Sequence, residues 1–175
     1  MPTDVSLSPL IAATAQWLTR AYPSGHGALE RGRAEAQSRQ AVTIAAWLRY
    51  PTDVDVQLVG LTGPGGSGRL DWIAGYEAPP ADGSAAARDE QAWRTWVDEV
   101  VASWAACLLG APALAVRAAG AVGGTEHAGA LPVAFRRLTE PDGDDHRAAA
   151  LLRHPDLLAP VADLHRARLL ERLGT

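Results

Sequence analysis

The chain has 175 residues, 47% of them hydrophobic and 21% charged, which is an ordinary composition for a globular protein. Its 20 acidic and 16 basic residues give a formal net charge of -4, which argues against nucleic acid or an anionic membrane as a partner, because both would be repelled. Every basic residue is Arg, so the sequence excludes a catalytic lysine. We expect one globular domain over residues 1–175, since a chain of this length can bury a core of its own.

The start of the chain has no basic leader, and its longest apolar run is far shorter than the about 20 residues that span a bilayer. The sequence therefore predicts a cytoplasmic protein with no membrane partner. Its single cysteine, Cys107, excludes an intramolecular disulfide. Because Cys107 falls inside a predicted apolar helix, we interpret it as a buried side chain and not as a nucleophile.

The first elements in chain order are a helix and a segment of uncertain structure. Residues 8–22 carry a broad apolar stripe and predict an N-terminal helix. Residues 23–40 are polar and rich in Arg, which indicates either an exposed helix or a mobile linker. Residues 41–50 fit both the alternation of a strand and the spacing of a helical face. We favour a strand that ends before Pro51.

Residues 53–77 predict a β-hairpin around which the fold is organised. Two runs with period-two alternation flank a glycine-rich loop, which is the pattern of two strands with one buried face. The side chains expected on that face are Val54, Val56, Leu58, Leu70, Trp72 and Tyr76.

The second half of the chain begins with the clearest predicted helix, over about residues 86–109. Its apolar stripe consists of Trp93, Trp96, Val97, Val100, Val101, Trp104 and Leu108. Two further strands are predicted at 114–122 and 131–135, joined by a glycine-rich hairpin loop at 123–129. The C-terminal segment predicts two helices with a break near Pro155 or Pro160.

This order of elements indicates an α+β fold. We expect an antiparallel sheet of about five strands packed against a Trp-rich central helix, with N- and C-terminal helices. The order is similar to the secretion-chaperone-like fold of small acidic dimeric proteins that bind partner polypeptides. The likeness is one of topology and involves no sequence motif, so it is an analogy.

The loop of the predicted hairpin offers a candidate ligand-binding site made of Gly63, Gly65, Gly66, Ser67, Gly68 and Arg69. Gly63 and Gly68 match the glycines of the phosphate-loop motif, but Arg69 replaces its Lys and Leu70 replaces its metal-binding Ser or Thr. The motif also needs a following helix whose amides hold the phosphate, whereas residues 70–77 alternate as a strand. We therefore interpret this segment as a flexible turn, with phosphate binding through Arg69 as an alternative.

Glu126 and His127 are the candidate catalytic residues. A histidine beside a carboxylate in a loop can act as a general base, although a solvated turn would contain the same residues. No short metal-ligand spacing joins the five histidines, so we expect no metal and no cofactor. Asp144 or Asp145 is expected to cap the helix that follows, and the alternative is that Asp142, Asp144, Asp145 and His146 hold a cation.

Since these residues form no coherent catalytic constellation, we expect a non-catalytic protein-binding or chaperone-like module. We expect it to be a homodimer with a protein partner. The alternative is a small enzyme or ligand-binding protein with a small molecule in a pocket between sheet and central helix. The arginines near the C-terminus form a basic patch without interleaved aromatic residues, which favours docking or self-association over nucleic-acid binding.

Overall fold

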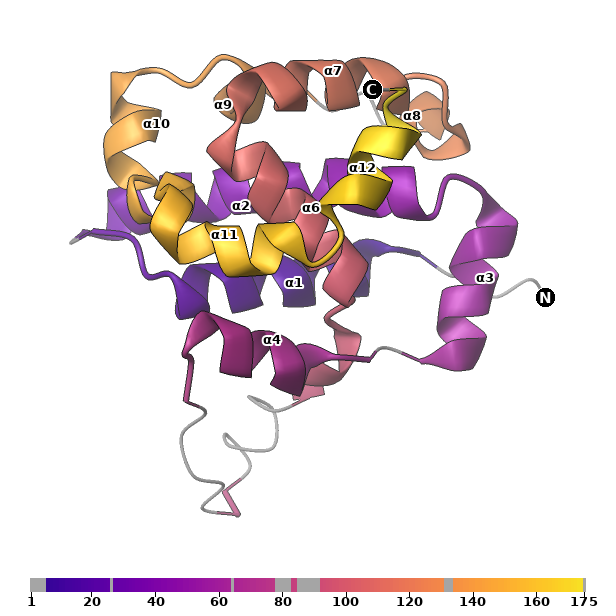
Figure 1. The fold of residues 1–175 in the computed structure, drawn as a ribbon, viewed down its shortest axis with the longest axis horizontal. Coiled ribbons are helices and arrows are strands. Elements are labelled where there is room, and N and C mark those ends of the chain that lie inside the picture. Colours follow the sequence, from indigo (N-terminus) through magenta and orange to yellow (C-terminus); the bar gives the residue numbers. More distant parts are fainter. Residues whose placement is uncertain are drawn as a thin grey trace.

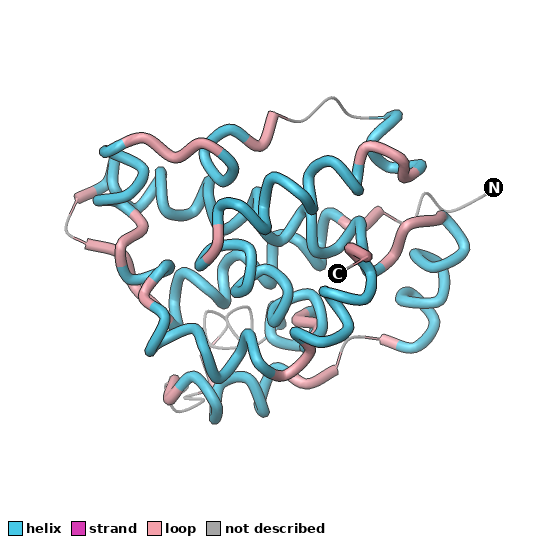
Figure 2. Tube along the Cα trace, turned by 45° about the horizontal axis from the view of Figure 1, so that its top comes forward, coloured by secondary structure: helices cyan, strands magenta, loops and turns pink. Residues whose placement is uncertain are grey.

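The computed structural model describes residues 6–25, 27–63, 65–77, 83–84, 92–130 and 134–174. Within these ranges every regular element is a helix, as Figure 2 shows. The predicted α+β fold with its antiparallel sheet is therefore wrong, and the analogy to the secretion-chaperone-like fold is lost with the sheet. The helices are α1 (Ser8–Ala21), α2 (Ala28–Arg49), α3 (Asp53–Thr62), α4 (Ser67–Ala74), α6 (Glu99–Gly110), α7 (Pro112–Val122), α8 (Glu126–Ala130), α9 (Arg136–Thr139), α10 (Gly143–Ala148), α11 (Pro155–Asp163) and α12 (Arg166–Arg172), with 3-10 turns η1 (Trp93–Trp96) and η2 (Leu151–Arg153).

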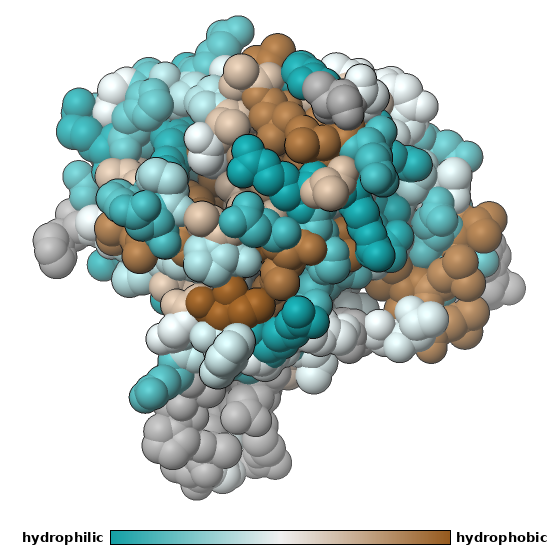
Figure 3. Space-filling model, viewed as in Figure 1, coloured by the Kyte–Doolittle hydropathy of each residue, from teal (hydrophilic) through white to brown (hydrophobic). Residues whose placement is uncertain are grey.

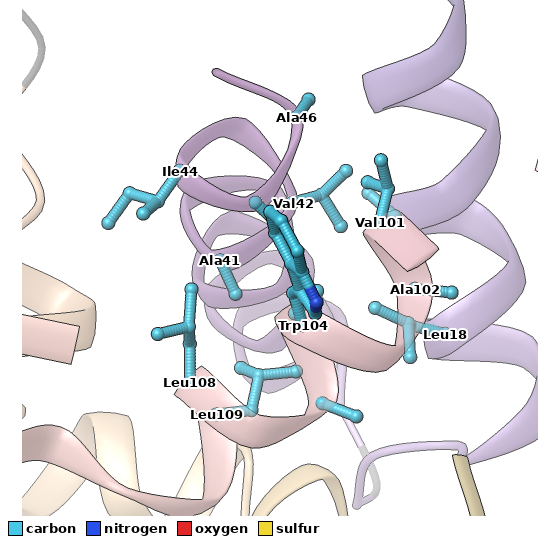
Figure 4. Packing of buried hydrophobic residues seen from close by; sticks show 14 of the residues in the cluster. Leu18, Ala41, Val42, Ile44, Ala46, Val101, Ala102, Trp104, Leu108 and Leu109 are labelled. Atoms are coloured by element: carbon cyan, nitrogen blue, oxygen red, sulfur yellow. The ribbon is translucent and has the colours of Figure 1, made fainter. Parts of the chain in front are cut away.

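Helix α2 lies at the centre of the bundle, against α1, α6, α7, α9 and α10 (Figure 1). Helix α6 in turn lies between α2 and α11. The contact between α2 and α6 is seen in Figure 4, where Ala41, Val42 and Trp104 lie close together. Ala34, Ala41 and Ala45 have no exposed surface, and small side chains at such positions let helices approach closely.

The prediction of a strand at 41–50 is wrong, because these residues continue α2 to Arg49. Every side chain from 41 to 48 except that of Thr43 is buried. A helix covered on all sides shows an apolar run that fits either period, so periodicity alone could not decide between helix and strand. The preceding residues 28–40 form the first half of the same helix.

The hairpin predicted at 53–77 is also wrong, since α3 and α4 occupy it. Thr52 begins α3 with a capping box: its hydroxyl accepts from the amide of Asp55, whose carboxylate accepts from the amide of Thr52. Val56 is the buried residue of α3, whereas Val54 and Leu58 are exposed. The alternation at these three positions is therefore accidental.

The Trp-rich central helix is shorter than predicted. Asp98 starts α6 by accepting hydrogen bonds from the amides of Val100 and Val101, at 2.8 and 3.1 Å. The part of the prediction on residues 85–91 lies outside the described residues.

The strand predicted at 114–122 is helix α7. Pro112 lies in its first turn, where the missing amide costs nothing, and Ala115, Ala118 and Val122 are buried at helical spacing. Of the strand predicted at 131–135, residues 131–133 lie outside the described residues. Helix α8 begins at Glu126, within the predicted hairpin loop. None of the helices in the described ranges is long and apolar enough to cross a membrane.

Helix α10 is attached to α2 and α9 by a buried carboxylate. Asp145 is fully buried, and its Oδ1 lies 2.5 Å from Nη1 of Arg137 and 3.9 Å from Nη1 of Arg33. Its backbone carbonyl accepts from Nε2 of Gln37 on α2, at 2.7 Å. A buried carboxylate is tolerated when it is paired in this way, and it becomes costly when either partner is removed.

We expect Asp145→Asn to lower the free energy of unfolding by about 3 kcal/mol, because the change removes the charge that the surrounding guanidinium groups neutralise. Urea denaturation measures this loss. Asp144→Asn is the matched control, since the exposed Asp144 also pairs with Arg33 and should cost less than about 1 kcal/mol. Equal losses in the two variants would contradict this role for Asp145.

Candidate protein-binding site

Glu126 and His127 attach α8 to the start of α3 and the end of α2. Nε2 of His127 lies 2.7 Å from the carbonyl oxygen of Tyr50. Because a carbonyl can only accept, this nitrogen carries the proton. The carboxylate of Glu126 accepts from the amide of Asp53 at 3.3 Å. In the described part of the chain the two side chains make no hydrogen bond to each other, and their observed partners are backbone groups.

The residues of the candidate loop are divided between two helices. Gly63 ends α3, Gly65 lies in the connection, and Gly66 precedes the first residue of α4. Ser67, Gly68 and Arg69 form the first turn of α4. A helix therefore does follow the glycines, contrary to the expectation from the sequence.

A carboxylate already lies at the start of α4. The side chain of Glu99 packs against Gly66 so closely that a Cβ there would lie 2.2 Å from its Cγ. Nη1 of Arg69 lies 3.8 Å from Oε2 of the same carboxylate. This acidic group offsets the positive end of the helix dipole and would repel a phosphate. The surroundings of the loop therefore favour a structural contact with α6 over a phosphate site.

Cys107 is buried, and its thiol donates to the carbonyl of Ala162 at 3.5 Å. Burial raises the pKa of Cys107 to about 11, so the thiol stays protonated at neutral pH. The described residues contain no group of three or more His, Cys, Asp or Glu side chains that could hold a metal ion.

The exposed apolar surface of α3 is the candidate binding site. Val54, Leu58 and Leu61 are 65%, 52% and 83% exposed, and their spacing places them on one side of the helix. We call these three residues the α3 face. Figure 1 shows α3 at the edge of the molecule, and Figure 3 shows hydrophobic surface at the same place. Exposed apolar groups gathered on one element often mark a site of interaction.

The first turn of α3 is closed by a local capping box and bonded to α8. The capping box of Thr52 and Asp55 closes its first turn, and Glu126 from α8 accepts from the amide of Asp53. Val56 inserts into the core from the opposite side of the helix, with 2% of its surface exposed. The α3 face is therefore presented on an anchored helix, which reduces the entropy lost on binding.

Period-two alternation hides the α3 face, because it places Val54 and Leu58 on the buried side of a strand. A signal for it was present. Thr52 and Asp55 have the spacing of a capping box, and Val54, Leu58 and Leu61 follow at positions that share one helical face. Comparison of the chain with known protein-family models, curated proteins and solved structures gives no match.

We expect Gly66→Ala to lower the free energy of unfolding by about 2 kcal/mol, because Gly66 has a φ of 84° and its Cβ would collide with Glu99. Gly65→Ala is the control, since no atom lies within 4 Å of a Cβ at that position. Thermal or urea denaturation of both variants checks the difference. A similar stability for both would show that Glu99 does not pack against Gly66.

We expect the thiol of Cys107 to resist a maleimide at a pH of about 8 in the folded protein and to react once urea unfolds it. Burial and the raised pKa both suppress the thiolate. Mass spectrometry after a timed reaction measures the modified fraction. Reaction of the folded protein at the rate of a free thiol would contradict the buried position.

Proposed function

We propose that the protein is a non-catalytic, chaperone-like protein-binding module that self-associates through the α3 face as a homodimer. The observation that supports this proposal is the exposure of Val54, Leu58 and Leu61 on one side of an anchored helix. Pairing two such faces would remove apolar surface from water, which is the main driving force of protein association.

A second copy is the partner that best suits this face. In a two-fold contact the same residues lie on both sides, so one apolar face covers the other without a further complementary surface. The acidic side chains of α3, Asp53 and Asp55, both lie in its first turn. An antiparallel arrangement would place these carboxylates at opposite ends of the contact and align the two helix dipoles favourably.

The contact would be small. A helix of ten residues is about 15 Å long, so two copies of α3 alone would bury less area than a standard stable interface. We therefore propose a weak dimer that exchanges its partner. Such exchange would leave the α3 face available to an apolar segment of another protein.

The test is sedimentation velocity over a range of about 10 to 500 µM, where a weak dimer gives a sedimentation coefficient that rises with concentration. We expect the double variant Leu58→Glu, Leu61→Glu to remain a monomer, because pairing would bury its added charges. Leu29→Glu is the matched control. Leu29 is 72% exposed on α2, so the same change there should leave association intact.

A wild-type protein that stays monomeric over the whole range would refute the proposal. Equal association of the wild type and the double variant would refute the role of the α3 face. His127→Gln distinguishes the enzyme alternative: its amide can still donate to the carbonyl of Tyr50, so association should be unchanged, whereas any activity that depends on a histidine base should be abolished.

The enzyme alternative has lost the pocket between sheet and helix on which it relied, because the described residues form no sheet. The observed partners of Glu126 and His127 also give it no support, since both are backbone groups. We retain a cytoplasmic location and the absence of a nucleic-acid partner as part of the proposal. Both rest on the sequence, the second on the net charge of -4.

A further inference from the structure

We propose that a groove between α2, α6 and α12 binds a small organic anion, an apolar body that carries one carboxylate or phosphate group. The groove has a volume of about 500 Å³, within the usual range for small-molecule sites. The groove contains no residue of the α3 face, and binding in it does not require self-association.

The floor of the groove is apolar and belongs to the core. It is formed by Leu48 at the end of α2 and by Val100 and Trp104 on α6. Leu48 and Trp104 are each 4% exposed, and the indole Nε1 of Trp104 donates to the carbonyl of His165 at 3.1 Å. This hydrogen bond satisfies the polar atom of the indole, so its ring offers the groove a fixed apolar surface.

The rim of the groove is basic. Arg49 at the end of α2 and Arg168 and Arg172 on α12 line it, together with one carboxylate, that of Glu171. Figure 3 shows hydrophilic surface over α12. The rim therefore has a positive local charge on a chain whose net charge is -4.

The three guanidinium groups of the rim lack an ion pair with any described carboxylate, Glu171 included. Elsewhere most arginines in the described ranges pair with acidic residues, as Arg33, Arg94 and Arg137 do. Arg49 does contact the ring of Tyr50, at 4.8 Å, through its cationic carbon, but this contact uses the face of the guanidinium and leaves its N–H donors unoccupied.

Arg49 and Arg172 also lie in the last turns of their helices, where a positive charge offsets the helix dipole. That role needs only the charge and uses few of the N–H donors. A carboxylate or a phosphate would engage these donors in pairs, which is the geometry that distinguishes Arg from Lys in anion recognition. The rim thus supplies donors for an oxyanion directly above a floor that suits an apolar group.

A second hollow indicates how a ligand would be oriented. It has a volume of about 360 Å³ and shares Leu48 and Arg172 with the groove. Glu126 on α8 also lines this hollow. Because this carboxylate would repel a negative group, the oxyanion would lie at Arg168 and Arg172, and a longer ligand would extend a neutral part toward α8.

The test uses three probes with the same apolar body: naphthalene-1-acetate, 1-naphthyl phosphate and the neutral 1-naphthaleneethanol. We expect calorimetric titration to show binding of at least one anion, with the neutral analogue at least about ten-fold weaker, because hydrogen bonds to charged groups contribute roughly this much or more. The tighter of the two anions identifies the acid group that the groove prefers.

The double variant Arg168→Gln, Arg172→Gln should weaken anion binding by at least about ten-fold. Both side chains are exposed, so the variant should melt like the wild type. Arg166→Gln is the matched control on the same helix. Arg166 faces Asp163 at 3.9 Å and does not line the groove, so its loss should change the affinity less than about two-fold.

Three results would overturn the proposal. The first is no binding of either anion at about 1 mM. The second is an equal affinity for the neutral probe, which would show that the arginines of the rim do not contribute to binding. The third is an equal loss in the Arg166 control, which would show that the anions respond to general charge and not to the groove.

Discussion

The packing of α2 against α1, α6, α7, α9 and α10 is the constraint on which the rest of the structure depends. Its alanines allow α1 and α6 to approach, and the buried side chains of Gln37 and Ser38 each donate one hydrogen bond to another helix. Gln37 donates to the carbonyl of Asp145 on α10, and the hydroxyl of Ser38 donates to the carbonyl of Ala15 on α1 at 3.3 Å. A buried polar group without a partner is costly, so these bonds fix the rotation of α2 and the positions of its neighbours. The core is thereby specified by hydrogen bonds as well as by apolar contact.

The end of α2 connects this core to both proposed binding surfaces. The hydroxyl of Tyr50 donates to Asp98 at the start of α6, and its carbonyl accepts from His127 on α8. Burial, followed by the hydrogen bond to Asp98, raises the pKa of Tyr50, so the phenol remains a donor.

The adjacent Leu48 and Arg49 contribute to the floor and rim of the groove. The α3 face begins a few residues later, after the Thr52 cap. The end of α2 therefore supports both surfaces, although the α3 face is apolar and the rim of the groove is basic.

The candidate residues named from the sequence have structural roles that their neighbours in the chain did not reveal. Glu126 and His127 are neighbours in the chain, which suggests an acid–base pair. In the structure, however, each side chain makes a hydrogen bond to a backbone group of another element. Gly66 has a positive φ that favours glycine. It also packs against Glu99, which lies 33 positions further along the chain and leaves no room for a Cβ. The groove between α2, α6 and α12 is lined by both the end of α2 and α12, although these two segments are more than 100 positions apart in the chain. Spacing in the sequence carries no information about such contacts, because they arise only from packing.

The sequence by itself determined the N-terminal helix, the burial of Cys107 and the helix that contains it. These features follow from composition and from helical spacing over a single element. It did not determine whether residues 41–50, 53–62 and 114–122 were helix or strand. At 41–50 the apolar run fitted both periods, and at Val54, Val56 and Leu58 a chance alternation matched a strand.

Only the tertiary structure decided these elements, since the surface that each buries depends on which helices surround it. The same packing left Val54, Leu58 and Leu61 in water and brought Arg49, Arg168 and Arg172 around one groove.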